Sequence, residues 1–346
     1  MEQRAREGDF IETVEGLIFD VKGLIHPPER FIAYLRYYPD INGQRIRQGI
    51  RYEKIYTLEN RFEFLEKKFP QYIFYDKTCG ETLQGIPREN IKKIYHPTNF
   101  LGELLGKNEE DLQNSASLPL QKAFKLVSLI QVRAGIKYRN IGISGSLLVN
   151  LETAESDIDL IIYGSKSVYL VREALSELYT TDHERIQPYS EKTLQDLYKF
   201  RGRESGISFQ DFVKIEQRKK LQGIFKGTDY YIRCIKDWEE IQYKYGEITY
   251  KPLEFATIKG IISNDTESIF TPCKYSLESS KIINGFKPQV QIQEIVSYRG
   301  RFCEQAGRGE AVEARGKVES VNFNNKIYYR LLLGAYKEDY MKLLNI

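Results

Sequence analysis

Asp157 and Asp159 occupy alternate positions where an apolar stretch begins, within "GISGSLLVNLETAESDIDLIIYG" at residues 142–164. Aspartate is depleted in β-strands, and side chains two residues apart lie on the same face of a strand. The two carboxylates are therefore expected side by side, where their like charges repel and burial adds to the cost. A divalent cation would offset that repulsion, because Mg²⁺ binds one or two protein carboxylates together with substrate phosphates. The alternative is a turn-and-cap role at the start of the strand.

The segment just upstream suits the same chemistry. "RNIGIS" is expected to be a short strand that runs into Gly145-Ser146 and then a helix through "LLVNLE". Such a turn offers backbone N–H groups, a hydroxyl and the positive end of a helix dipole to a phosphate. Glycine at position 145 lets the backbone approach the anion closely.

The elements that position these residues form an α/β region at residues 101–245. Helical periodicity covers residues 118–135, with Pro119 near the start and Gly135 at the end. "DIDLIIYG" is the next strand and "KSVYLVREALSELY" the next helix. Two more helices, "SEKTLQDLYKF" and "SFQDFVKIEQRKKLQ", lead into the strand "TDYYIRCI".

The flanking regions, residues 1–100 and 246–346, are β-rich. One helix, "TLENRFEFLEKKF", interrupts the first region. The predicted fold class is therefore α+β, with a short mixed sheet and helices between two β-rich regions. A weakly similar pattern, in which a glycine lies between two short β-like halves, recurs around Gly16, Gly260 and Gly316. Either hairpins simply look alike, or the two terminal regions pack together as one β-rich module.

The motif "ISGS", ten residues, then "DIDLII" resembles the signature of the DNA polymerase β-type nucleotidyltransferase superfamily. The resemblance is clear over residues 120–165 and extends to about residue 236. The whole chain is similar to an uncharacterised archaeal group of predicted nucleotidyltransferases. The resemblance implies a polymerase β-like nucleotidyltransferase domain. A template-directed DNA polymerase fits poorly, since nothing resembles a helix-hairpin-helix clamp.

The resemblance also implies residue roles. Gly145 and Ser146 would grip the β- and γ-phosphates of a nucleoside triphosphate. Asp157 and Asp159 would hold two Mg²⁺ ions, for which Mn²⁺ is expected to substitute, one on the triphosphate and one shared with the attacking hydroxyl. The reaction would be in-line displacement at the α-phosphorus with release of pyrophosphate.

A third carboxylate usually accompanies this pair in the superfamily. Asp229, which opens "TDYYIRCI", is the candidate for that catalytic and metal-binding role, and Asp182 and Glu184 are the alternatives. Without a third carboxylate the domain would bind nucleotide without turning it over.

The acceptor is harder to identify from the sequence. Residues 297–317 are rich in arginine and glycine, and the candidate acceptor-binding residues are Arg299, Arg301, Arg308 and Arg315. Interleaved glutamates favour a balanced, solvated surface instead. "QRIRQGIRYEK" at residues 44–54 presents the same choice. An RNA, a protein and a small molecule all stay open as acceptors.

Composition limits the function classes. Of 346 residues, 41% are hydrophobic and 29% charged, and the net charge of +3 permits nucleic-acid binding without arguing for it. No apolar stretch approaches the ~20 residues of a membrane helix, and the N-terminus lacks a signal-peptide core, so a cytoplasmic location without membrane contact is expected. Four cysteines and three histidines are too scattered for a zinc site or a Ser-His-Asp triad. Two classes stay open: a nucleotidyltransferase, or a non-catalytic nucleotide- or RNA-binding protein that retains the fold.

Overall fold

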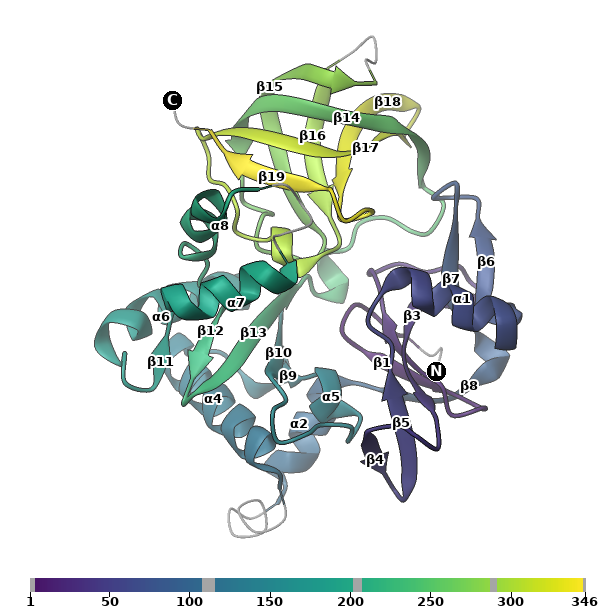
Figure 1. Ribbon diagram of the computed structural model, residues 1–346, viewed down its shortest axis with the longest axis vertical. Coiled ribbons are helices and arrows are strands. Elements are labelled where there is room, and N and C mark those ends of the chain that lie inside the picture. Colours follow the sequence, from purple (N-terminus) through teal and green to yellow (C-terminus); the bar gives the residue numbers. More distant parts are fainter. Residues whose placement is uncertain (1–3, 108–115, 202–206, 287–290, 345–346) are drawn as a thin grey trace. The chain divides into compact units, whose positions relative to one another are not determined.

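The computed structural model describes residues 4–107, 116–201, 207–286 and 291–344 (Figure 1). The chain divides into two compact units. The first runs to Tyr75 and adds Thr82–Gln187 and Leu221–Gln242; the second comprises Asp76–Glu81, Pro188–Lys220 and the chain from Tyr243 onward. Helices and several sheets are mixed, so the expected α+β class is confirmed at that level.

The first unit begins with an N-terminal sheet of order β4-β5-β3-β2-β1-β8, to which β7 and β6 add through β3. Its strands are β1 Phe10–Thr13, β2 Ile18–Val21, β3 Arg30–Pro39, β4 Arg45–Arg47, β5 Ile50–Lys54, β6 Ile73–Asp76, β7 Glu81–Pro87 and β8 Ile91–Tyr95. Burial alternates along β3, as expected for a strand with one core face. The stretch before it forms the two antiparallel strands β1 and β2, because the chain turns at Gly16, whose φ is +83°.

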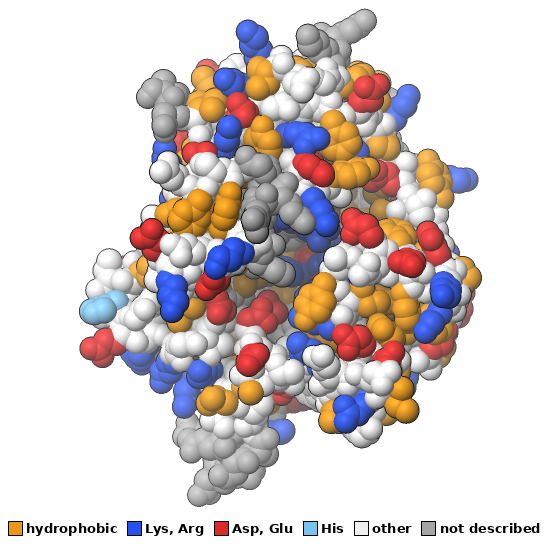
Figure 2. Space-filling view, in the orientation of Figure 1, with side chains coloured by type: hydrophobic (Ala, Val, Ile, Leu, Met, Phe, Trp, Pro, Cys, Tyr) orange, Lys and Arg blue, Asp and Glu red, His pale blue; other side chains and the backbone are white. Residues whose placement is uncertain are grey.

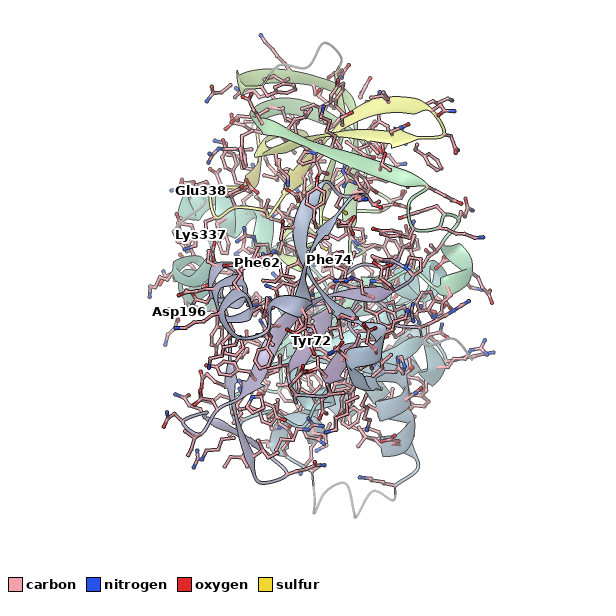
Figure 3. The ribbon with its side chains drawn as sticks, turned by 90° about the vertical axis from the view of Figure 1, so that its right-hand side faces the viewer. Phe62, Tyr72, Phe74, Asp196, Lys337 and Glu338 are labelled. Atoms are coloured by element: carbon pink, nitrogen blue, oxygen red, sulfur yellow. The ribbon has the colours of Figure 1, made fainter. Side chains whose placement is uncertain are left out.

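Helix α1, Leu58–Lys68, lies where "TLENRFEFLEKKF" predicted a helix. Thr57 caps its N-terminus, since its side chain accepts from the Asn60 N–H. The short 3-10 helix Pro70–Tyr72 follows, and the fully buried Tyr72 precedes Phe74 of β6 (Figure 3). A second 3-10 turn, Arg88–Asn90, joins β7 to β8.

The central sheet of the first unit has the order β11-β12-β13-β10-β9. Its strands are β9 Ile141–Ile143, β10 Ile158–Tyr163, β11 Ile186–Gln187, β12 Gln222–Phe225 and β13 Thr228–Ile235. Only the β10–β13 pair is parallel among these, so the sheet is short and mixed as expected. The accompanying helices are α2 Pro97–Leu105, α4 Leu118–Ala134, α5 Gly145–Leu148 and α6 Ser165–Thr181, with 3-10 turns at Tyr138–Asn140 and Trp238–Glu240.

Helix α4 has the ends that its sequence predicted. The Ser117 side chain accepts from the Leu120 N–H at the start, and Gly135 ends the helix in the left-handed conformation, with φ +62°. In contrast, the helix predicted through "LLVNLE" ends at Leu148, and the last predicted helix, α8, ends at Glu216. No helix within the described ranges is long and apolar enough to cross a membrane.

The N-terminal region packs on the face of the central sheet that carries alternate residues of β10 and β13. Ile161, Tyr163 and Ile235 form a small apolar cluster with Leu24. Gly8 has φ +91°, which favours glycine, and a Cβ added there would lie 2.0 Å from the end of the Ile161 side chain. The same face begins, at its other end, with Asp159.

The second unit contains α7 Glu191–Arg201, α8 Phe209–Glu216 and a sheet that closes on itself (Figure 1). Its strands are β14 Ile248–Asn264, β15 Cys273–Gly285, β16 Ile292–Ser297, β17 Ala311–Phe323, β18 Lys326–Leu333 and β19 Tyr340–Leu343, with a 3-10 turn at Gly300–Phe302. The order is β14-β15-β16-β18-β17-β19, and β14 also pairs with β17. Buried residues from all these strands fill one core.

The predicted boundaries at residues 100 and 245 stay predictions, while the N-terminal and central sheets belong to one compact unit.

Candidate active site around Asp157 and Asp159

Asp159 lies in β10, and Asp157 directly precedes that strand. The apolar residues that alternate with them, Ile158 and Leu160, are fully buried on the opposite face. Asp157 is exposed and Asp159 is partly buried. Burial, and next the charge of Asp157, raise the pKa of Asp159 to about 7. The repulsion between the pair, expected from the alternation alone, is thus present in the fold.

Gly145 lies directly against the Asp159 carboxylate. The Ser144 N–H donates to the Asp159 carbonyl oxygen (2.9 Å), which brings the turn after β9 alongside β10. Gly145 has φ +65°, and a Cβ there would lie 2.1 Å from Asp159 Oδ2. Backbone conformation and space both require glycine at this position.

Ser146 is also adjacent, but its side chain is buried and its hydroxyl is 3.2 Å from the Ser156 hydroxyl. Ser156 also accepts from the Thr153 N–H, so it fixes the loop that leads to Asp157. Because α5 has only four residues, a helix dipole contributes little to anion binding here. Phosphate binding would depend on backbone N–H groups and on nearby cations.

Those cations come from the N-terminal sheet. Lys54 on β5 has a pKa lowered to about 8, by burial first and then by the charges of Arg36 and Arg45. Asp157 and Asp159 act on Lys54 in the opposite direction, which puts the carboxylate pair within its electrostatic range. A guanidinium N–H of Arg45 donates to the Leu151 carbonyl oxygen, just past α5. These three basic residues, Arg36, Arg45 and Lys54, are called the basic cluster below.

A buried ion network supports the other side of Asp159. Arg233 follows Tyr231, the register partner of Asp159, by two residues on β13. Its guanidinium pairs with Glu7 at 2.5 Å, and Lys22 pairs with Glu7 at 3.0 Å and with Asp20 at 2.7 Å. Arg233 lowers the pKa of Asp159 while Asp20 raises it. The network ties the N-terminal region to the strand that neighbours the carboxylate pair.

Asp229, the predicted third carboxylate, opens β13 as expected. The parallel register pairs Ile158 with Tyr230, so its continuation by one residue sets Asp229 beside Asp157. Within the described ranges, no three His, Cys, Asp or Glu side chains are grouped closely enough to hold a metal ion. Asp229 therefore stays a prediction. Of the alternatives, Asp182 caps the end of α6 and pairs with Arg185 at 2.5 Å.

The four predicted acceptor-binding arginines all lie in the second unit. Arg299 donates to the Gly334 carbonyl oxygen, Arg301 stacks on Phe302, Arg308 is exposed in a turn, and Arg315 lies 5.9 Å from the Phe255 ring centre. The glutamates among them have other partners: Glu310 pairs with Arg218, and Glu313 with Lys342. On the face seen in Figure 2, acidic and basic side chains are interspersed rather than gathered by sign.

Sequence reasoning missed Arg36 and Ser156, and it left "QRIRQGIRYEK" undecided although this stretch contains Arg45 and Lys54. Nothing local marks Arg36 as a site residue, because it follows the regular alternation of β3. A serine that directly precedes "DID" was the one available signal for Ser156.

Comparison with known proteins gives a relative without an assigned activity. The uncharacterized protein MJ1086 of Methanocaldococcus jannaschii is 33% identical over 352 residues, which cover 99% of each chain. The chain belongs to the family of that protein. No family model matches the chain, and no solved structure matches it.

Proposed function

We propose that this member of the MJ1086 family is a magnesium-dependent nucleotidyltransferase with a polymerase β-like catalytic domain. It would transfer a nucleoside monophosphate from a nucleoside triphosphate to an acceptor hydroxyl. The acceptor oxygen forms a bond to the α-phosphorus, the bond from that phosphorus to the bridging oxygen of the β-phosphate breaks, pyrophosphate leaves, and the hydroxyl proton passes to water.

The supporting observation is that the site contains two repulsions between like charges, called charge conflicts below: one within the carboxylate pair and one within the basic cluster. The carboxylates repel each other, and burial and this repulsion raise the pKa of Asp159 to about 7. The basic cluster also repels itself, since burial and the two arginines lower the pKa of Lys54 to about 8. A cation relieves the first conflict and a polyanion relieves the second. A metal–triphosphate complex carries both, so it complements this site better than either ion alone.

The residues present fit magnesium. Asp157 and Asp159 supply hard oxygen ligands from one strand face, which is the donor type that Mg²⁺ prefers. Two protein carboxylates with phosphate oxygens are a usual ligand set for this ion. When bound, the ion would supply charge stabilisation to the entering and leaving oxygens.

The chain's other residues would orient the nucleotide. Gly145 lets the backbone lie close to the phosphates, and Ser156 holds the loop before Asp157 through the Thr153 N–H. The basic cluster would bind the negative charge that accumulates on pyrophosphate as it leaves. Arg233, partly buried on the neighbouring strand β13, would keep Asp159 in place as a positioning residue.

The test is magnesium-dependent pyrophosphate release from each of the four nucleoside triphosphates, with and without cellular RNA. Asp157→Asn and Asp159→Asn should each abolish release, because each removes a ligand charge. Asp196→Asn is the matched control, since this carboxylate is exposed on α7 and pairs with Lys199 (Figure 3). Asp229→Asn and Asp182→Asn are compared to test which residue is the third carboxylate, since only the substitution of that residue should abolish release.

Loss of activity in both Asp157→Asn and Asp159→Asn, but not in Asp196→Asn, supports the proposal. Release that persists in both would contradict it. The alternative is a protein that binds nucleotide without turnover. In that case wild type releases no pyrophosphate under any condition, while calorimetry still detects triphosphate binding that the two aspartate variants weaken.

A further inference from the structure

The closed sheet of the second unit has a distinctive strand order. Five strands close in the order β14-β15-β16-β18-β17 and back to β14 (Figure 1). Every neighbouring pair is antiparallel except β16 with β18. Counted along the chain this is 1-2-3-5-4-1 with strand 3 parallel to strand 5, which is the topology of an OB-fold barrel. Barrels of this kind use the outer face around strands 2 and 3 to bind extended ligands.

The outer face of β16 and β18 is polar and aromatic. Ile295 and Leu331 are paired in register and point into the core, so their neighbours Glu294 and Arg330 point outward. Arg330 is nevertheless 94% buried, because its guanidinium lies 4.0 Å from the Tyr250 ring centre and Nε donates to Glu319 (2.7 Å). A cation on an outer strand face is thus held in place by an aromatic ring and a carboxylate.

Four tyrosines lie within electrostatic range of this guanidinium, and they form the tyrosine cluster: Tyr243, Tyr250, Tyr298 and Tyr328. Tyr243 and Tyr298 are each 38% exposed, so parts of both rings face solvent. The Tyr328 hydroxyl donates to Glu294 (3.2 Å). Burial raises the pKa of Tyr250 to about 12, which keeps its phenol neutral and able to donate. Tyr298 directly follows β16, the third strand, and Glu294 lies on it, so both belong to the ligand-binding side of this topology, whereas Tyr250 on β14 and Tyr328 on β18 extend the cluster to the first and fifth strands.

We propose that the tyrosine cluster on this barrel face binds single-stranded RNA. Unpaired bases stack on aromatic rings with little regard to sequence. Glu294, which is partly exposed on the same face, can accept a hydrogen bond from a ribose 2′-hydroxyl, which DNA lacks. Base-paired RNA hides the faces of its bases, so a stacking surface selects single strands.

The charge of the region agrees with a nucleic-acid ligand. Residues 243–346 contain 15 Lys and Arg against 12 Asp and Glu, a net charge of +3 that equals the net charge of the whole chain. The remainder of the chain is therefore balanced, and the positive excess lies with the barrel. The excess is modest, so stacking rather than phosphate neutralisation should dominate, and affinity should fall only weakly with salt.

The test is fluorescence anisotropy of the full chain with a labelled 12-nucleotide single-stranded RNA, without magnesium or nucleotide. We expect binding that Tyr298→Ala and Tyr243→Ala each weaken by about tenfold or more, from the loss of one stacked base. Tyr298→Phe should bind nearly as wild type, since it retains the ring. The matched control is Tyr169→Ala on α6, where the tyrosine is 40% exposed, and it should change nothing.

Three results would overturn the inference: no binding of the RNA, equal loss in the Tyr169 and Tyr298 variants, or tighter binding of single-stranded DNA, duplex RNA or an oligosaccharide. If Tyr298→Ala alters the circular dichroism spectrum, ultraviolet crosslinking of wild type to RNA decides instead, and crosslinks that avoid the tyrosine cluster refute it. The proposal does not rest on nucleotidyl transfer. Asp159→Asn should bind the RNA as wild type does, so a failure of either proposal is visible separately.

Discussion

Gly145 provides the sharpest test of the candidate active site, because its substitution acts on Asp159 without removing a charge. In Gly145→Ala the new Cβ would lie 2.1 Å from Asp159 Oδ2, against about 3.4 Å for ordinary contact. The carboxylate or the turn must therefore move by more than 1 Å. A displacement of that size at a reacting centre lowers the rate by about 10²-fold, or about 2.7 kcal/mol of barrier.

Backbone strain accompanies the collision and must be separated from it. Alanine at positive φ costs about 1–2 kcal/mol in a folded chain. Gly135 has nearly the same φ, +62° against +65°, but a Cβ there meets nothing within 4 Å. Gly135→Ala therefore reports strain alone, with a fall in Tm of roughly 2–4 °C for each kcal/mol.

The assay measures pyrophosphate release and, in parallel, the rise in Tm on adding magnesium and triphosphate. We expect Gly135→Ala to lose stability but retain both signals, and Gly145→Ala to lose both. The reasoning is refuted if the two variants melt alike and Gly145→Ala keeps wild-type release, since the carboxylate would then not depend on that turn.

Three further predictions concern the charges around the pair. Asp159 has a pKa of about 7 in the folded state against an ordinary 3.8, so between these pH values the folded state binds a proton that the unfolded state does not. The free energy of unfolding should therefore fall by a few kcal/mol, to order of magnitude, as pH rises from about 4 to 7. Urea melts of Asp159→Asn should lack this dependence on pH. Lys54→Met should weaken triphosphate binding by about tenfold or more in calorimetry, and Lys67→Met on α1 is the control that should bind as wild type does. Because the pKa of Lys54 is lowered to about 8 in the folded state, removal of its charge should also stabilise the protein at pH 7. Arg233→Leu removes one of the two cations that pair with the buried Glu7 carboxylate and should lower the free energy of unfolding by about 1.5–3 kcal/mol, because Lys22 still pairs with Glu7. Arg185→Leu removes a half-exposed guanidinium and should leave the urea midpoint unchanged, and equal midpoints in the two variants would contradict the contribution of the buried network.

Elements with local signals could be predicted from the sequence. Helix α4 begins beside Pro119 and ends at Gly135, both of which act within one turn of the chain. The alternation of Asp157 and Asp159 predicted their common face, because strand geometry fixes it without tertiary information. The helix after Gly145 was expected to be longer, since "LLVNLE" is apolar enough for a helix but instead turns at Leu148 into the loop held by Ser156.

Site residues supplied by distant strands could not be predicted in this way. Arg36 and Lys54 precede Asp157 by about a hundred residues and reach it only because the N-terminal sheet packs on the β10–β13 face. That packing depends on Gly8 against Ile161, a contact with no signature in either segment. The barrel likewise closes through β16 and β18, whose parallel register no local pattern specifies.

The arrangement of charge separates this site from the structural ion pairs elsewhere in the chain. Arg330 with Glu319, and Arg233 with Glu7, are opposite charges at 2.7 Å and 2.5 Å that satisfy each other. Around Asp159, burial first and then neighbours of like sign shift the pKa values, upward for the Asp159 carboxylate and downward for Lys54. A fold optimised for stability alone would remove such conflicts, and proteins retain them where a ligand resolves them. The carboxylate pair favours added positive charge and the basic cluster favours added negative charge, so the proposed metal–triphosphate substrate, which carries both, suits this arrangement.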